Sequence, residues 1–277
     1  MTSERKGLLH MIAASLCWSL GGLCIKFIPW GAMTIIGVRS LFGALVFAAY
    51  KKSFIIRFTR GNIISALCLA STIILFVFAN KLTTAAAAIL LQFTAPIFII
   101  LIELIFYKKK PRVSELAAVF ITICGMLLFF VGKLDGSGVL GNALAIGSGL
   151  SFAGVFVCNK RSDTDPDQSL LMGFFINAIV GLPFAFLGVT ADVNAWMSIL
   201  ILGIVQVGVA YIFFSMGIKR TSALLACLIT AMEPVLNPVW VALATGEVPD
   251  AFAISGGVII LLTVVGYNLW VETHKII

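Results

Sequence analysis

Charged residues are scarce in this sequence. Only 11% of its 277 residues are Asp, Glu, Lys or Arg, whereas a soluble domain has roughly 25%. Apolar residues make up 61% of the chain, and the mean hydropathy is +1.11. This composition excludes a soluble enzyme, a disordered chain and a secreted disulfide scaffold. Because the apolar runs are continuous rather than alternating, a β-barrel is disfavoured, and we predict an all-α integral membrane protein.

The motifs of metal binding and of common enzyme chemistry are missing as well. The two histidines, His10 and His274, have no metal-ligand partners in the sequence, and the cysteines form no CxxC pair. There is no GxxxxGK motif followed by Ser or Thr, which argues against direct use of ATP, and no GxSxG motif of a serine hydrolase. We therefore expect no catalytic residue, no metal and no cofactor.

Ten apolar runs are each long enough to cross a bilayer, since a spanning helix needs about 20 residues. Short polar breaks separate them and leave no room for a soluble domain. The predicted spans are 8–28, 31–50, 61–80, 84–106, 113–131, 139–158, 168–189, 194–217, 221–243 and 251–271.

Basic residues gather in alternate connections between these spans. Fifteen of the 19 lie at the termini or in every second loop, and three lie in the other loops. By the positive-inside rule, this sorting places both termini in the cytoplasm. The net charge of +7 then reflects topology and contact with anionic lipid, not nucleic acid. The fifteen are Arg5, Lys6, Lys51, Lys52, Arg57, Arg60, Lys108, Lys109, Lys110, Arg112, Lys160, Arg161, Lys219, Arg220 and Lys275, and the three are Lys26, Lys81 and Lys133.

The two halves of the chain match one another at nearly constant offsets, which indicates an internal repeat with units 1–134 and 135–277. Each unit holds five predicted spans. Because five is odd, the two units insert with opposite orientations, as in the inverted repeats of many secondary transporters. At an offset of 134, Gly7, Ile12, Leu16, Cys24 and Lys26 match Gly141, Ile146, Leu150, Cys158 and Lys160, and Trp18 meets Phe152. At an offset of 138, Thr83, Thr84, Pro96 and Pro111 meet Thr221, Ser222, Pro234 and Pro249.

Five short segments carry a resemblance to a known family. They are Cys17-Trp18-Ser19 to Lys26, Tyr211 to Gly217, Thr221-Ser222-Ala223, Glu233-Pro234-Val235 and Gly246-Glu247-Val248-Pro249. These segments are similar to the EamA pattern, found in the ten-helix branch of the drug/metabolite transporter superfamily. The resemblance covers nearly the whole chain but is more diffuse in the first half, where Tyr107-Lys108 stands in place of a Gly-Glu pair common in the family.

One acidic residue, Glu233, lies far from both ends of its predicted span. Ionisable groups in the hydrocarbon core are costly, so this carboxyl group is a candidate to bind a proton or a cationic substrate. The alternative is a structural carboxylate that bonds neighbouring helices. The candidates on this segment are Glu233, Thr230 and Asn237 for binding, which share one helix face, and Pro234 and Pro238 for a hinge.

Arg39 is the basic residue inside a predicted span, about 12 Å from its start at 1.5 Å per residue. It could attract a substrate carboxylate or neutralise Glu233, or it could be an anchor between helices. Glu103 lies close to the Lys108–Lys110 cluster, with which it could pair.

Uncharged polar and aromatic residues add further candidates. Gln92 lies one turn before Pro96 on the same face, in the repeat partner of the helix that carries Glu233, and Gln206 lies in the middle of another span. We expect both glutamines to line a cavity, Pro96 to act as a hinge, and Trp18 to form either an aromatic wall or ordinary packing. Asn177 is expected to bond neighbouring helices.

These observations predict a ten-helix secondary transporter in an inner or plasma membrane, as a monomer or homodimer. Two inverted halves would rock about a central cavity and move a small polar or amphipathic metabolite, with amino acids and related compounds implied by the resemblance. Export is the expected direction. The alternatives are uptake of a metabolite or organic cation, a scramblase for lipid head groups, and an integral-membrane enzyme.

The sorting of basic residues generates a direct prediction about topology. A reporter fused after residue 277 should behave as a cytoplasmic protein, because fifteen basic residues lie at the termini and in the loops on the same side, and the positive-inside rule places that side in the cytoplasm. A fluorescent fusion compared with an alkaline phosphatase fusion measures this. A phosphatase-active fusion would mean an odd number of spans and would contradict the inverted repeat.

Overall fold

The computed structural model describes residues 3–21, 24, 28–131, 138–245 and 250–273. Within these residues the chain is helical and contains no β-strand. The first half forms α1 (Ser3–Trp18), α3 (Ala32–Lys51), α4 (Arg60–Leu82), α5 (Ala85–Gln92), α6 (Ala95–Tyr107) and α7 (Val113–Phe129). The second half forms α8 (Val139–Cys158), α9 (Pro166–Gly181), η1 (Leu182–Phe184), α10 (Ala185–Gly188), α11 (Val193–Leu200), η2 (Ile201–Val209), α12 (Ala210–Ile218), α13 (Ala223–Thr230), α14 (Met232–Thr245) and α15 (Ala251–Thr273).

Seven helical stretches among the described residues are long and apolar enough to cross a membrane, as expected for an all-α, multi-pass membrane protein. The other three predicted spans correspond to shorter helices: α1, α7 and the pair α13 and α14. The seven stretches are Ala32–Lys51, Arg60–Leu82, Ala87–Tyr107, Val139–Cys158, Pro166–Phe184, Val193–Ile218 and Ala251–Val271.

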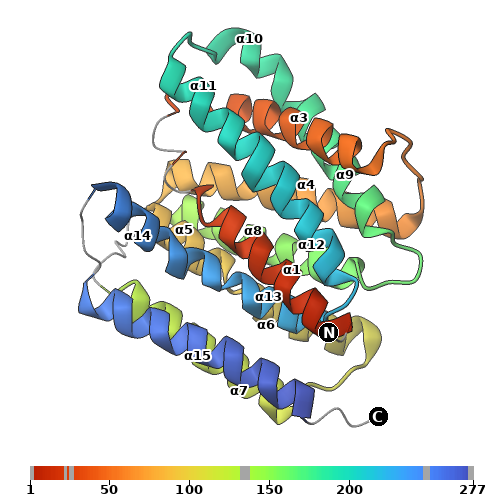
Figure 1. The fold of residues 1–277 in the computed structure, drawn as a ribbon, viewed down its shortest axis with the longest axis vertical. Coiled ribbons are helices and arrows are strands. Elements are labelled where there is room, and N and C mark those ends of the chain that lie inside the picture. The colour runs from red at the N-terminus through yellow and green to blue at the C-terminus, as the bar shows by residue number, and fades with distance from the viewer. Residues whose placement is uncertain (1–2, 22–23, 25–27, 132–137, 246–249, 274–277) are drawn as a thin grey trace.

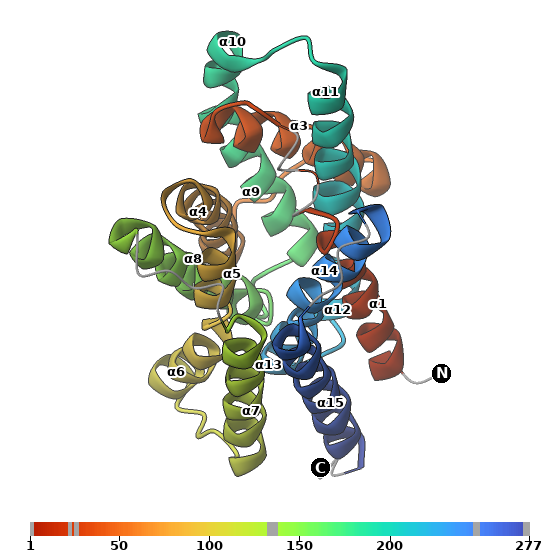
Figure 2. The same cartoon turned by 90° about the vertical axis from the view of Figure 1, so that its left-hand side faces the viewer.

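The long helices cross the bundle side by side (Figure 1). Helix α1 begins and helix α15 ends at the same end of the bundle, and the connections α3–α4, α6–α7, α8–α9 and α12–α13 lie there too (Figure 1). We call this end the terminal side. In the view turned by 90°, α3, α10 and α11 form one extremity of the bundle and α7 and α15 the other (Figure 2).

Two of the predicted spans, 84–106 and 221–243, are interrupted at equivalent positions. Helices α5 and α13 each have eight residues. The side chains of Thr84 and Ser222 cap them, each accepting a hydrogen bond from the backbone N–H three residues further on. After each short helix the chain breaks and resumes as α6 or α14, with Pro96 or Pro234 in the first turn. A proline donates no backbone N–H, so it is tolerated in that turn and disfavours a continuous helix.

In two other predicted spans, the α-helix ends before the apolar run does. Helix α1 ends at Trp18 and is followed by a turn, although the run extends to residue 28. Helix α9 ends at Gly181 and continues as the tighter 3₁₀ turn η1, which contains Pro183. Hydropathy alone cannot locate such ends, because they depend on backbone hydrogen bonding rather than on apolar content.

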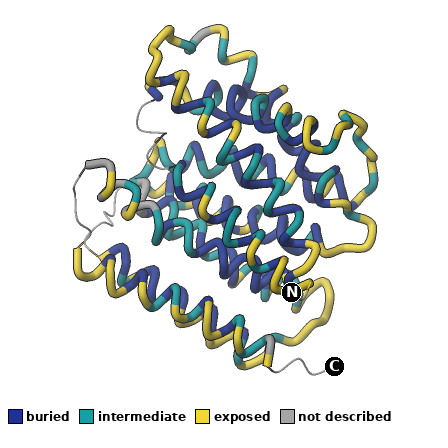
Figure 3. Tube along the Cα trace, viewed as in Figure 1, coloured by how far each residue is buried: buried dark blue, intermediate teal, exposed yellow. Residues whose placement is uncertain are grey.

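Aromatic and aliphatic side chains fill the centre of the bundle. The largest fully buried ones include Phe47, Phe156, Phe174 and Phe214. Large apolar side chains are also exposed around the bundle, for example on α15, where the exposed positions repeat along the outer face (Figure 3). In water such a surface would be unfavourable, whereas in a bilayer it contacts lipid tails.

Helices α3 and α9 approach closely at a pair of glycines. A Cβ atom built on Gly37 would lie 2.4 Å from the backbone carbonyl carbon of Gly181 and from the nitrogen of Leu182. Neither contact can be relieved by a side-chain rotation, because both atoms belong to the backbone. Small residues at such crossings allow helices in membranes to pack backbone against backbone.

The close approach predicts that Gly37→Ala destabilises the protein by about 1–3 kcal/mol, the usual cost of overpacking. The melting temperature in detergent should fall. Gly266→Ala is the matched control, because a Cβ on Gly266 meets no atom within 4 Å. Equal melting temperatures for the two variants would show that α3 and α9 do not pack in this way.

Candidate functional site

A cavity of about 70 Å³ lies between the two halves of the bundle. A water molecule needs roughly 10–15 Å³ of such space, so the cavity has room for a handful of waters. Five of the seven residues predicted to bind substrate or protons line it: Trp18, Arg39, Gln92, Gln206 and Glu233. They come from α1, α3, α5, η2 and α14, so helices distant in sequence converge here.

Glu233 is the second residue of α14, directly after the break that follows α13. The side chain is half-buried and lines the cavity. It makes no hydrogen bond or ion pair with any residue that the structure describes. Pro234 follows it and is buried. The break therefore places on the cavity wall a carboxyl group that has no bonded partner in the described part of the chain.

Arg39 reaches the same cavity from α3. Only 5% of the residue is exposed, and its Nε atom is buried without a hydrogen-bond partner among the described residues. No ion pair links Arg39 to Glu233 within the described chain, so the two charges share a cavity without direct contact. Tyr211 lies within electrostatic range of both. A buried charge without a partner is costly, so this arrangement suits a bound group that supplies the missing partner.

Gln206 lies on η2, a π-helical segment within the long helical stretch that continues into α12. Its Nε2 atom donates to the backbone carbonyl of Trp18 at 3.3 Å, and its Oε1 atom is buried without a partner among the described residues. π-Helical turns are rare and occur frequently at functional sites, because they displace side chains from the regular register.

Gln92 is more firmly held. Its Nε2 atom donates to the hydroxyl of Ser148 at 2.8 Å, and that hydroxyl donates to the backbone carbonyl of Thr72 at 2.9 Å. This chain joins α5, α8 and α4 beside the cavity. Gln92 therefore has a structural bond and also faces the cavity.

Trp18 forms an aromatic wall of the cavity. Its ring contacts Phe152 at 6.4 Å, Tyr211 at 5.0 Å and Phe214 at 5.8 Å between centroids. Phe152 is the repeat counterpart of Trp18 at the offset of 134, so equivalent positions of the two halves meet. The cavity lining also includes Tyr211, Phe152 and Thr72, which were not predicted as site residues. Tyr211 begins one of the segments that resemble the family.

The other predicted residues lie elsewhere. Thr230 is fully buried and donates to the backbone carbonyl of Cys227, and it is not part of the cavity lining. The side chains of Asn237 and Pro238 lie outside the described part of the structure. Pro96 is buried in the first turn of α6. The amide atoms of Asn177 are buried and have no partner among the described residues, so the expected bond between helices is not seen.

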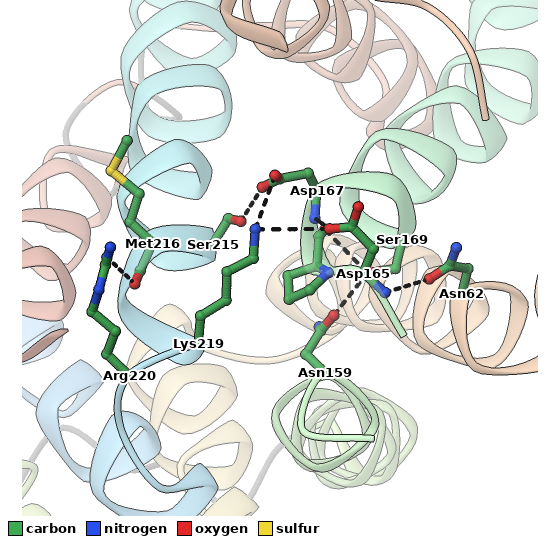
Figure 4. Close-up of polar contacts among 10 residues, drawn as sticks. Asn62, Asn159, Asp165, Asp167, Ser169, Ser215, Met216, Lys219 and Arg220 are labelled. Carbon is green, nitrogen blue, oxygen red and sulfur yellow. Dashed lines mark hydrogen bonds and ion pairs between the residues drawn. The ribbon is translucent and has the colours of Figure 1, made fainter. Parts of the chain in front are cut away.

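A polar network joins helix ends on the terminal side (Figure 4). Asp167 on α9 accepts hydrogen bonds from the hydroxyl of Ser215 and, at 2.9 Å, from Nζ of Lys219. The backbone N–H of Asp165 donates to Asn62 Oδ1 at 2.8 Å. The hydroxyl of Ser169 donates to Oδ1 of Asn159, also at 2.8 Å. The network ties the first turn of α9 to α4, to the residue after α8 and to the end of α12.

Asp163 extends this network in the α8–α9 connection. Its carboxylate accepts from Arg161 Nε at 2.8 Å and from the backbone N–H of Gly61 at 3.1 Å. The Arg161 guanidinium holds the pKa of the Asp163 carboxyl below its usual range. A lowered pKa keeps the carboxylate ionised at neutral pH, and its contribution is lost only as the pH falls through that lowered value.

Comparison with known families decides the class of the protein. The sequence model of the EamA-like transporter family matches residues 5–131 and, a second time, residues 139–269. The chain belongs to the EamA-like transporter family. The family implies a membrane transporter rather than an enzyme, and each of its two matches covers about half of this EamA chain.

Similar proteins carry transporter names. The uncharacterized transporter YxxF of Bacillus subtilis is 24% identical over 188 residues, which cover 64% of this chain and 60% of that protein. An uncharacterized transporter of Archaeoglobus fulgidus is 26% identical over 192 residues, 69% of each chain. The uncharacterized inner membrane transporter YicL of Salmonella typhimurium is 26% identical, with 56% of this chain and 57% of that protein covered. These likenesses support a multi-pass membrane transporter.

A crystal structure of another protein has the same fold. The TM-score is 0.82, with 17% identity, and the match covers 99% of this EamA chain and 100% of the other. At this identity the likeness concerns the fold alone.

The close approach of Gly21, three residues after the end of α1, to Gln206 on η2 generates a prediction. A Cβ atom on Gly21 would lie 1.8 Å from Gln206 Nε2, so Gly21→Ala must displace the amide from the cavity wall. The fold should survive, because the displaced group is the end of a flexible side chain, but ligand affinity should fall about tenfold with the loss of a polar contact. Ligand-dependent thermal shift measures this. Gly147→Ala, which meets only a methyl group at 3.5 Å, is the control, and equal affinities would exclude Gln206 from binding.

Proposed function

We propose that this protein is a secondary active transporter that moves a small polar or amphipathic metabolite by alternating access. The observation that carries the proposal is the cavity between the halves, with Arg39 and Glu233 on its wall and no direct bond between them. In an apolar bundle these groups need partners, and a bound cargo or proton can supply them. The cavity is small in this conformation, so cargo entry requires it to widen.

The inverted repeat supports the mechanism. The family model matches twice, and α5 and α13 agree in length, cap type and following proline. We infer ten spans in two five-helix units, 1–134 and 135–277, with opposite orientations. Rocking of one unit against the other would then open the cavity to either face.

We place the terminal side in the cytoplasm of an inner or plasma membrane, as the basic residues indicate. The network of Asp167, Ser215 and Lys219 then lies between the cavity and the cytoplasm. Tyr211, one helical turn before Ser215, contacts Phe174 at 5.2 Å between ring centroids. We infer that this aromatic contact and this polar network separate the cavity from the cytoplasm, and that both must part for release to that side.

The two cavity charges narrow the class of cargo. Arg39 can pair with a carboxylate, and Glu233 can pair with an amine or hold a proton. A zwitterion such as an amino acid satisfies both, which favours amino acids and related metabolites over apolar compounds. Export is the direction we expect, with uptake of a metabolite or an organic cation as the alternative, because direction follows the gradients of cargo and coupling ion.

Replacing Glu233 tests the role of the cavity carboxyl group. Glu233→Gln keeps the shape and removes the charge. Transport into or out of liposomes, measured with a panel of amino acids and amines, should fall at least about tenfold, equivalent to about 1.4 kcal/mol, or lose its pH dependence. The variant should fold, because a neutral amide is less costly to bury than an unpaired carboxylate.

Glu103→Gln is the matched control, since Glu103 pairs with Lys109 at 2.5 Å on the terminal side, away from the cavity. A Glu233→Gln protein with normal rate and pH profile would remove Glu233 from the coupling mechanism. The single variant Glu233→Gln could instead fail to fold while the double variant, with both Arg39→Gln and Glu233→Gln, folds. That result would show that the two residues form a structural charge pair.

A further inference from the structure

A second, larger hollow lies on the outer surface of the bundle, between α7 and α15. Its volume is about 490 Å³, and it is lined by apolar and small side chains of these two helices. The two helices lie next to one another at one extremity of the bundle in both views (Figures 1 and 2). We call this hollow the α7/α15 groove.

The groove spans about one leaflet of the bilayer. On α15 its lining runs from Ile259 to Trp270, and on α7 from Ser114 to Ile121. Trp270 lies eleven positions after Ile259, about 16.5 Å along the helix at 1.5 Å per residue. Half of a typical hydrocarbon core is about 15 Å. Ser114 and Trp270 lie toward the terminal side, so the groove extends from that face to the middle of the membrane.

The space in the groove exists because its wall lacks side-chain volume. A Cβ atom on Gly266 would meet no atom within 4 Å, and Ala117 and Ala118 line the facing helix. A flexible hydrocarbon chain can fill such a space, since it adapts its torsions to a narrow apolar channel.

The outer end of the groove is polar and basic. The hydroxyl of Ser114 lines the groove and is buried without a partner among the described residues. Tyr267 lines the groove, and Glu115, Arg112 and Glu103 all lie within electrostatic range of it. Around this end, residues 103–115 hold four basic residues against two acidic ones. Lys109 is bonded to Glu103 and lies 3.8 Å from Glu115, whereas Lys110 and Arg112 are exposed.

We propose that the α7/α15 groove binds one anionic phospholipid of the leaflet on the terminal side. One acyl chain fills the channel beside Gly266, and the phosphate lies near Ser114 and Arg112. The hydroxyl of Ser114 can donate a hydrogen bond to the phosphate. The basic residues attract the net negative charge of an anionic head group, whereas a zwitterionic head group has no net charge to attract.

The charge distribution argues against a second copy of this chain as the occupant. A two-fold dimer through this face would bring the same patch of each copy together. The basic residues at the outer end would then face their own copies, and like charges repel. An anionic lipid neutralises them instead.

The experiment is native mass spectrometry of the purified full-length protein, with phosphatidylglycerol or phosphatidylcholine of the same acyl chains added. We expect the protein to retain one phosphatidylglycerol molecule in preference to phosphatidylcholine. Arg112→Gln should lower this occupancy about fivefold, the effect of one basic residue near an anionic head group. Gly266→Leu should abolish it by filling the channel.

Each variant has a matched control. Lys51→Gln removes a basic residue at the end of α3, and Val265→Leu enlarges an exposed residue next to Gly266 that does not line the groove. Both controls should retain the lipid. Equal retention of the two lipids, or full retention in both Arg112→Gln and Gly266→Leu, would overturn the proposal. A protein that forms lipid-free dimers lost in Gly266→Leu would overturn it in favour of a second copy.

Discussion

A polar group inside an apolar bundle must find its partner within the protein, because the surrounding lipid offers none. Most of this chain obeys that constraint: hydroxyls such as those of Ser148 and Thr230 donate to nearby backbone carbonyls. Among the described residues, the exceptions include Arg39 Nε and Gln206 Oε1, both in residues that line the central cavity. The carboxyl group of Glu233, on the same wall, also has no bond to a described residue. Buried polar atoms without a partner among the described residues also occur elsewhere, for example in Asn177 and Ser114. What distinguishes the cavity is that such atoms lie there beside two ionisable side chains, those of Arg39 and Glu233.

The same constraint also governs how the helices can break beside the cavity without leaving backbone groups unsatisfied. A break frees backbone carbonyls, which hydroxyl groups then satisfy: Thr94 donates to the carbonyl of Leu91, and Thr230 to that of Cys227. The following prolines require no acceptor for a backbone N–H. Short helices α5 and α13 thus end next to the cavity at little cost, and the break after α13 places Glu233 on the wall.

Much of this could be predicted from the sequence. The scarcity of charged residues indicated a membrane protein, and segments matching at constant offsets paired the spans 84–106 and 221–243 as equivalents. The interruption of both spans was not predicted and is seen only in the structure. The cost of ionisable groups in lipid selected Arg39 and Glu233, which converge on one cavity. Thr230 was predicted to share a helix face with Glu233, but the structure places the two residues on different helices. Helix α13 ends at Thr230 and α14 begins at Met232, so the helical spacing does not continue from one residue to the other. The π-helical segment around Gln206 and the contacts of Asp165 with Asn62 depend on tertiary packing, which no local pattern records.

The size of the central cavity has a consequence for the heat of binding. A volume of about 70 Å³ has room for only a few waters, beside the polar side chains of Arg39 and Gln206. Apart from the surface that is rearranged when the cavity widens, an entering cargo displaces few waters and buries little apolar surface beyond that of Trp18 and its ring neighbours. Calorimetry should therefore record a favourable enthalpy with only a small negative heat-capacity change, the signature of polar contacts rather than of hydrophobic association.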